Sequence, residues 1–126
     1  MFGWCGTVLG VDLTRQTFAK KDLSPDVGRD FLGGRGLNAK TLFDRVGPGV
    51  DPLGPENLLC FAPGILTATA LGLSSRLHVS TLSPYSGILG DGNVGGTMAS
   101  AMKKAGYDQL VVAGASPKPV YLVIED

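Results

Sequence analysis

Alternating and continuous hydrophobic runs along the chain predict several β-strands. The stretches CGTVLGVDL (5–13) and QTFAKKDL (16–23) flank a short turn, which predicts a hairpin. LLCFAP (58–63) is a continuous apolar run typical of a buried strand. SSRLHVSTL (74–82) alternates strictly, so that Arg76 and His78 are expected on the same face of a strand. Two more strands are predicted near the end of the chain, over YDQLVVAGA (107–115) and PVYLVIED (119–126).

Three segments carry helix signals. SPDVGRDFL begins with Ser24 as the expected N-cap and Pro25 in the first turn, and the glycines at 33 and 34 are expected to end this helix. GLNAKTLFDRV (36–46) predicts a second helix. GTMASAMKKAG (96–106) predicts a third, which ends in two lysines and a glycine. The pattern therefore predicts a single α+β domain over residues 1–126, with strands in the majority.

The composition of the chain argues against several classes of function. Lys plus Arg and Asp plus Glu are 11 each, so the net charge is zero and no basic footprint for nucleic acid or a membrane surface is present. The uncharged run 57–75 contains Pro63, Gly64 and Gly72, which favours a buried strand followed by a loop over a membrane span. The chain shows no basic leader, so we expect a cytoplasmic protein with reduced thiols. With only Cys5 and Cys60, we expect that it cannot hold an iron–sulfur cluster alone.

Glycine is enriched, with 19 residues, and one cluster forms a G-x-G-x-x-G spacing in GDGNVG. Gly90, Gly92 and Gly95 match a dinucleotide fingerprint, but the motif comes late in the chain and no acidic residue follows about twenty positions later. A dinucleotide-binding domain is therefore disfavoured. Two interpretations stay open: a phosphate-binding loop before a helix, with Asn93 as a cap, or an ordinary tight turn.

Two further features are relevant to ligand binding but do not identify the ligand. FLGGRGLNAK (31–40) repeats the arrangement of glycines before a helix, around Arg35, which favours an anion or cofactor surface. Arg76 and His78 suit contacts with phosphates or planar heterocycles, although a solvated strand face is the commoner outcome for such a pair. No nucleophile pairs recognisably with His78, and the acidic residues show no metal-site spacing.

Several segments, in order, resemble the N-terminal domain of the tungsten-containing aldehyde:ferredoxin oxidoreductases. The specific phrases are DPLGPEN (51–57), LSPYSG (82–87), AGYD (105–108) and KPVYL (118–122), and the resemblance covers nearly the whole chain. It implies an α+β domain with two sheets related by internal duplication, of which residues 1–126 hold the first half or more. It also implies that the domain forms the base for a tungsten or molybdenum bis-pterin cofactor whose phosphates are joined through magnesium.

The resemblance also implies site residues. Arg76 matches the family arginine that contacts the pterin and lies between it and the iron–sulfur cluster. Asn93 matches the residue whose backbone carbonyl helps hold the magnesium ion, and Gly95 matches the adjacent backbone contact. Val94 stands where serine is common, which removes a hydroxyl but no amide, and Gly96 completes the expected cofactor-binding turn. No catalytic residue is expected on this chain.

For a full enzyme, the resemblance implies oxidation of an aldehyde and water to a carboxylate, with electrons passed through a 4Fe–4S cluster to ferredoxin. Cluster ligands and substrate-side residues are expected in other domains, so the chain alone is expected to be inactive. The alternative is a pterin-binding module, either stand-alone or a subunit, which a homodimer could complete.

Overall fold

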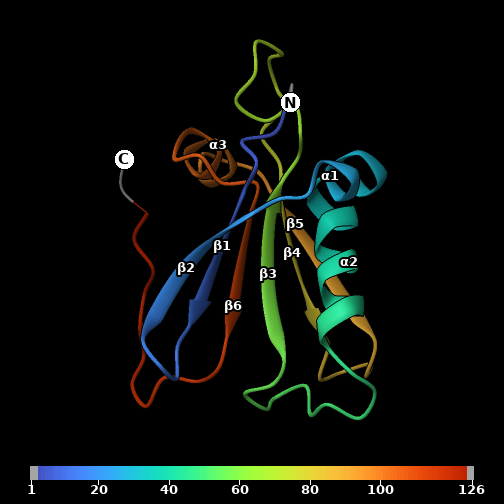
Figure 1. Ribbon diagram of the computed structural model, residues 1–126, viewed down its shortest axis with the longest axis vertical. Coiled ribbons are helices and arrows are strands. Elements are labelled where there is room, and N and C mark those ends of the chain that lie inside the picture. Colours follow the sequence, from blue (N-terminus) through green and yellow to red (C-terminus); the bar gives the residue numbers. More distant parts are fainter. Residues whose placement is uncertain (1–2, 125–126) are drawn as a thin grey trace.

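Six strands pair into one mixed sheet in the computed structural model, which describes residues 3–124 (Figure 1). The order across the sheet is β2-β1-β6-β3-β4-β5. The bounds are β1 Thr7–Asp12, β2 Thr17–Asp22, β3 Leu58–Pro63, β4 Leu77–Leu82, β5 Leu89–Val94 and β6 Gln109–Ala113. The predicted α+β class is confirmed, and within residues 3–124 the strands form a single sheet, so that the second sheet stays a prediction.

Strand pairing follows the hydrophobic pattern closely. β1 and β2 form the predicted antiparallel hairpin, with Val8 opposite Lys21. β6 lies in the middle of the sheet, parallel to β1 and antiparallel to β3. β3 and β4 are antiparallel, with Cys60 opposite Ser80. The continuous apolar composition of β3 and β6 agrees with strands that are covered on both faces.

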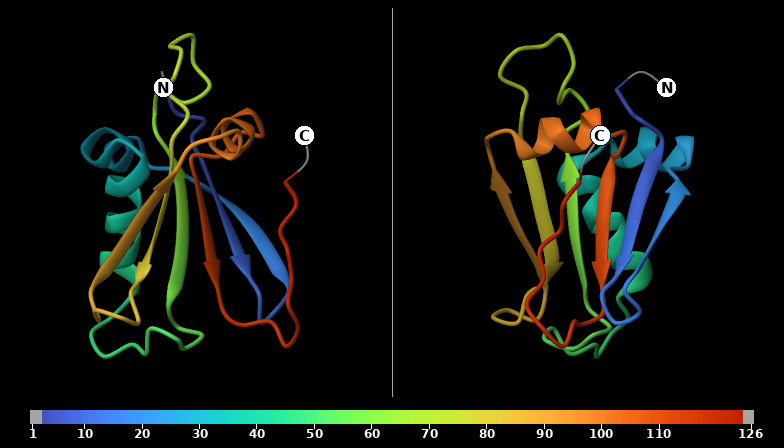
Figure 2. Two further views of the ribbon diagram at one scale, coloured as in Figure 1. Left: turned by 180° about the vertical axis from the view of Figure 1, so that it is seen from behind. Right: turned by 90° about the vertical axis from the view of Figure 1, so that its left-hand side faces the viewer.

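Three helices cover the two faces of the sheet: α1 Pro25–Phe31, α2 Gly34–Arg45 and α3 Met98–Lys104. α2 packs on β3 and β4, and α3 packs on the opposite face, as the side view in Figure 2 shows. The core therefore has two parts. One is formed on the α2 side by Leu42, Leu58, Cys60 and Val111, and the other on the α3 side by Leu9, Leu77, Ala99, Met102 and Leu110.

Helix α1 starts as predicted, with Ser24 at the N-cap position and Pro25 in the first turn, although the Ser24 side chain makes no cap hydrogen bond. The helix ends at Phe31, and Leu32 takes the left-handed conformation (φ 61°) that reverses the chain. α2 begins at Gly34, two residues before the predicted start. A side chain at Gly36 would meet the Phe31 carbonyl at 2.3 Å, so the sharp turn between the helices requires glycine there.

Two predictions were wrong. Residues 89–94 form the edge strand β5, whereas the glycine content had predicted a loop. The predicted strand at 119–126 does not form within its described part: residues 119–124 run alongside the sheet without pairing, and residues 125–126 lie outside the described range. Strand composition alone therefore did not decide pairing at either place.

One end of the sheet gathers segments that are far apart in sequence. The beginning of β4, the end of β5, the loop between α1 and α2, and helix α3 all lie at the upper end in Figure 1. The long loop between β3 and β4 projects from the same end. This end holds all the residues singled out from the sequence as cofactor contacts.

Candidate functional site

The antiparallel pairing of β4 with β5 places Arg76 beside Asn93. Leu77 pairs with Val94 and His78 pairs with Asn93 in this register. Arg76 directly precedes β4, and its Nη1 donates a hydrogen bond to Asn93 Oδ1 at 3.2 Å. Among residues 3–124, no carboxylate lies within ion-pair distance of the exposed Arg76 guanidinium. The remaining guanidinium donors are therefore open to a ligand.

A pair of serines fixes the turn that follows β5. Ser75 Oγ donates to the Gly96 carbonyl at 2.7 Å, and Ser100 Oγ donates to Ser75 Oγ at 3.1 Å. These bonds connect the start of β4, the turn and helix α3. The five predicted residues Arg76, Asn93, Val94, Gly95 and Gly96 are thus brought together, while their individual roles stay predictions.

The backbone of this turn is bare toward solvent. A Cβ atom added at Gly92 or Gly95 would meet no atom within 4 Å, so packing inside the chain does not require glycine at either position. Gly96 has φ +97°, a conformation that favours glycine. Val94 is exposed. A flat molecule could approach this stretch of main chain closely.

The proposed loop-to-helix geometry was wrong in detail. Asn93 lies within β5 and does not cap α3, whose N-cap position is Thr97. Two of the three glycines of G-x-G-x-x-G, Gly90 and Gly92, lie within the edge strand β5 and not in the turn before α3. The strands on either side of α3 in the sequence, β5 and β6, are not neighbours in the sheet, so they do not form the parallel βαβ unit of a dinucleotide site. The structure therefore supports rejecting the dinucleotide-binding interpretation.

Asp91 organises the charged residues on the α2 side of β5. Its carboxylate accepts a hydrogen bond from Arg35 Nε at 2.7 Å and one from Ser80 Oγ at 2.8 Å, and His78 Nδ1 lies 3.6 Å away. Burial alone would raise the pKa of Asp91, but the hydrogen bonds from Ser80 and Arg35 and the Arg35 charge outweigh it and lower the pKa. Asp91 is therefore a carboxylate at neutral pH.

A buried polar network supports this arrangement from inside the core. Asn38 is fully buried, and its Nδ2 donates to Ser80 Oγ (3.1 Å) and to the carbonyls of His78 and Cys60 (3.2 Å each). Gln109 Nε2 donates to Asn38 Oδ1 at 3.0 Å, and Thr41 Oγ1 donates to Gln109 Oε1 at 3.1 Å. Sequence reasoning missed Asp91, Asn38 and Gln109. The only signal for the last two was a polar residue on an otherwise apolar helix face or strand.

The described residues hold no ready-made metal centre of side chains. No group of three His, Cys, Asp or Glu residues comes together in residues 3–124. Cys60 is fully buried, and burial raises the pKa of its thiol to about 12. Within the same range, no helix is long and apolar enough to cross a membrane.

Comparison with known proteins identifies the family of the chain. Residues 8–126 match the family model described as "Aldehyde ferredoxin oxidoreductase, N-terminal domain". The tungsten-containing aldehyde ferredoxin oxidoreductases of Thermococcus kodakarensis and Pyrococcus abyssi are 39% and 38% identical to the chain, all of which is covered, together with 21% of each relative. A "WOR-like subunit" of aliphatic sulfonate oxidoreductase from Pyrococcus furiosus is 38% identical, again over the whole chain and 20% of that protein.

The solved structure of the "Active site complex BamBC of Benzoyl Coenzyme A reductase in complex with 1,5 Dienoyl-CoA" also matches. The TM-score is 0.90 at 42% identity, and the match covers 93% of this chain and 18% of that one. The family match and the fold together identify the chain as the N-terminal domain type of this oxidoreductase family. The chain belongs to the aldehyde ferredoxin oxidoreductase family, and it spans about a fifth of the length of the curated relatives that it matches.

Proposed function

We propose that this chain is the cofactor-binding base of a larger oxidoreductase that carries a tungsten or molybdenum bis-pterin group. The contact between Arg76 and Asn93 is the observation that carries the proposal, because it places an unneutralised guanidinium beside the bare turn at 93–96. Two relatives are named as tungsten-containing enzymes, which supports a metal of this kind in the cofactor.

The residues at this end of the sheet fit such a group. Such a cofactor combines pterin heterocycles with phosphates, and it needs close approach to main chain together with directional donors. Gly92 and Gly95 leave the space above the backbone open, since no neighbour occupies the position of a side chain. A guanidinium presents several donors in one plane, which suits heterocycle oxygens and phosphates alike.

Each residue has a proposed task. Arg76 would donate to the pterin, Val94, Gly95 and Gly96 would offer main-chain contacts, and the backbone carbonyl of Asn93 would help to hold a magnesium ion. When bound, the cofactor supplies a two-electron oxidation of an aldehyde and water to a carboxylate, with the electrons leaving through a 4Fe–4S cluster to ferredoxin. The chain's own part is to bind and orient. We propose that the cluster ligands lie on other domains, so that this chain does not oxidise aldehydes alone.

The experiment is to compare Arg76→Ala with Arg29→Ala in the full-length oxidoreductase. Arg29 is an exposed arginine on α1 that pairs with Asp26 and does not contact the turn. Tungsten and molybdenum are measured by mass spectrometry and pterin by its fluorescence after release. We expect Arg76→Ala to retain several-fold less metal and pterin, and Arg29→Ala to retain both. Equal cofactor content in the two variants would mean that the site is misplaced.

A subunit-type or stand-alone pterin-binding module is a second candidate. Two matched proteins are named as parts of assemblies, a "WOR-like subunit" and an "Active site complex". Stoichiometric pterin on the 126-residue chain, without aldehyde-dependent dye reduction, would favour this candidate. Measurable dye reduction by the chain would contradict both. A homodimer and a cytoplasmic location stay predictions from the sequence.

A further inference from the structure

Two serine hydroxyl groups, which we call the serine pair, join the turn at 93–96 to the start of β4 and to helix α3. Ser75 Oγ lies 2.7 Å from the carbonyl oxygen of Gly96, and Ser100 Oγ lies 3.1 Å from Ser75 Oγ. A carbonyl oxygen can only accept, so the single proton of the Ser75 hydroxyl is used in the bond to Gly96. Ser100 must therefore donate to Ser75, and the two bonds run in one direction, from α3 to the turn.

The main chain that receives the bond from Ser75 is conformationally free by itself. Gly95 and Gly96 are adjacent and exposed, and a Cβ atom at either position would meet no atom within 4 Å. Glycine reaches more backbone conformations than any other residue and loses the most entropy when it is held in one of them. Gly96 is nevertheless found at φ +97°. The hydrogen bond from Ser75 to its carbonyl favours this one conformation.

The serine pair itself is attached to well-packed parts of the fold. Beside Ser100 on α3, Ala99 and Met102 are each 2% exposed and belong to the core on that side of the sheet. Ser75 precedes Arg76, whose carbonyl accepts a hydrogen bond of 3.1 Å from the amide of Gly64, directly after β3. The bond from Ser75 therefore fixes the turn relative to the backbone of Arg76.

We infer that Ser75 is a positioning residue for the proposed cofactor site and that Ser100 orients its hydroxyl group. The inference rests on the proposed function and adds two residues to it. Ser75 has no proton left to donate to a ligand, so it acts through the turn. Ordering of the turn before the cofactor binds lowers the entropy lost on binding, and it sets the spacing between Arg76 and the turn in advance.

Ser74 provides a matched control for Ser75. Its side chain is half-buried, as that of Ser75 is, but its Oγ lies 2.7 Å from the Leu66 carbonyl and 2.9 Å from the Leu71 carbonyl, in the loop between β3 and β4. Ser74→Ala therefore removes the same kind of group from the adjacent position and leaves the bond to the turn in place. Ser75→Thr is the conservative variant, because it retains the hydroxyl group.

The first experiment measures backbone NMR order parameters of Gly95 and Gly96 in the 126-residue chain. Ser75→Ala should lower them from about 0.85, the value of rigid backbone, to below about 0.6. Ser100→Ala should give values in between, whereas Ser74→Ala and Ser75→Thr should leave them unchanged. The urea midpoints of Ser74→Ala and Ser75→Ala should agree, since neither group is fully buried. Order parameters that do not respond to Ser75→Ala would overturn the inference.

The second experiment follows the loss of tungsten, molybdenum and pterin from the same variants of the full-length oxidoreductase during dialysis. Ser75→Ala should lose the cofactor about fivefold faster than the unsubstituted protein, which is the effect of one neutral hydrogen bond. Ser75→Thr and Ser74→Ala should lose it at the original rate. Equal rates for Ser74→Ala and Ser75→Ala, or a rate for Ser75→Thr as fast as for Ser75→Ala, would contradict a positioning role of the hydroxyl group.

Arg76→Ala, measured in parallel, separates this inference from the proposed function. If Arg76→Ala loses the cofactor and Ser75→Ala retains it, the proposed site stands and the role of Ser75 is wrong. If Arg76→Ala retains the cofactor, the proposed site is wrong, and the order parameters of the 126-residue chain still decide whether Ser75 orders the turn.

Discussion

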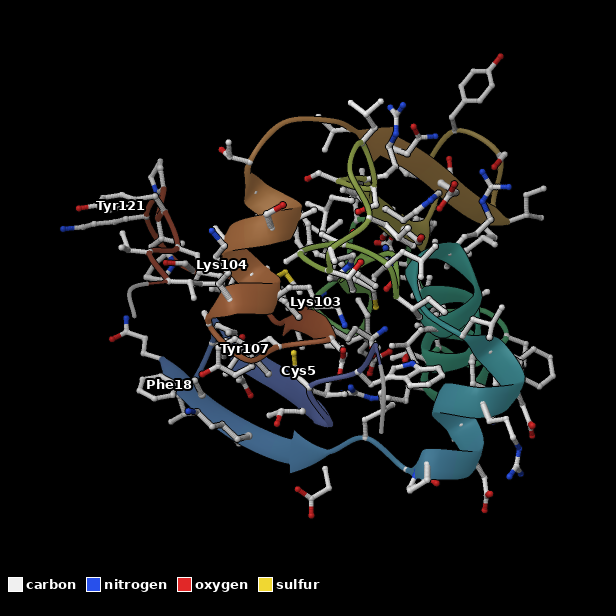
Figure 3. All side chains as sticks on the ribbon, turned by 90° about the horizontal axis from the view of Figure 1, so that it is seen from above. Cys5, Phe18, Lys103, Lys104, Tyr107 and Tyr121 are labelled. Carbon is white, nitrogen blue, oxygen red and sulfur yellow. The ribbon has the colours of Figure 1, made fainter. Side chains whose placement is uncertain are left out.

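Two charged clusters at the same end of the sheet differ in how completely their groups are paired. In the first, which we call the closed cluster, Lys103 Nζ contacts Asp108 Oδ1 at 2.5 Å and donates to the Gly3 carbonyl at 2.7 Å. Asp108 also accepts from the backbone amides of Cys5 (3.1 Å) and Gly6 (2.6 Å). Figure 3 labels Lys103 on α3 and Cys5 beside it, and the Cys5 thiol lies 3.4 Å from the Lys103 carbonyl. The side chains of Lys103 and Asp108 are almost fully buried.

The second, the open cluster, consists of Arg35, Arg76, His78 and Asp91. Its acid is 12% exposed, but Arg35 is 61% exposed and Nδ1 of His78 has no partner. The closed cluster uses its polar groups to attach the N-terminal segment to α3 and β6. The open cluster retains donors that the fold does not use. Unpaired polar groups on a well-supported frame are a feature of binding sites, since a ligand completes them.

Breaking the closed cluster should have the largest effect on stability. Asp108→Ala would leave the Lys103 ammonium buried without its carboxylate and two amides without an acceptor. We expect the free energy of unfolding to fall by about 3–5 kcal/mol, measured by urea denaturation. Lys104→Ala, at an exposed neighbouring position, is the control and should change it by less than about 0.5 kcal/mol. A small effect of Asp108→Ala would show that the closed cluster contributes no more to the stability of the fold than the open one.

Much of the frame that holds both clusters could be predicted from the sequence. Apolar runs and helix-start signals gave strands β1, β2, β3, β4 and β6 and all three helices close to their observed bounds, because burial and local propensity agree in them. β5 failed because LGDGNV has the composition of a loop, and only its register against β4 makes it a strand. The predicted strand over PVYLVI failed for the opposite reason. Its composition is typical of a strand, but a strand forms only where a neighbouring strand is available for pairing.

The site was only partly predictable. The sequence pattern already pointed to Arg76 as a phosphate contact and to Asn93 as a cap, but their roles at one cofactor site came from the family resemblance. Their contact depends on a hairpin register that no spacing rule specifies. Asp91 and Asn38 were missed because their partners are distant in sequence: Arg35 for the first, Ser80 and Gln109 for the second. Hydrogen bonds of this kind follow from tertiary packing, and local patterns do not reveal them.

The second prediction asks whether the open cluster rests on its buried network. Asn38→Ala removes donors to Ser80 and to two carbonyls, and it leaves Gln109 Nε2 without its acceptor. We expect a loss of about 2 kcal/mol in the free energy of unfolding, because buried polar groups lose their partners. Asn93→Ala is the matched control, since Asn93 is exposed, and it should change stability by less than about 0.5 kcal/mol. Equal effects of the two variants would mean that the network does not support the site.

The smallest expected effect concerns pH and the acid of the open cluster. Because the pKa of Asp91 is lower in the folded chain than in the unfolded one, its ionised form stabilises the fold. That contribution is complete above the unfolded value of about 3.9 and is lost as the pH falls from there through the lower folded value. At pH 7, Asp91→Asn should cost about 1 kcal/mol, a modest amount because Arg35 is largely exposed.

Urea denaturation of both proteins between pH 7 and pH 2.5 measures this difference. The two stabilities should converge toward the acid end, since protonated Asp91 resembles asparagine in charge. A difference that stays constant with pH would indicate that Asp91 acts through its shape and its bond with Ser80 alone. The ion pair with Arg35 would then contribute little to the stability of the fold, as is common for a pair with a largely exposed partner.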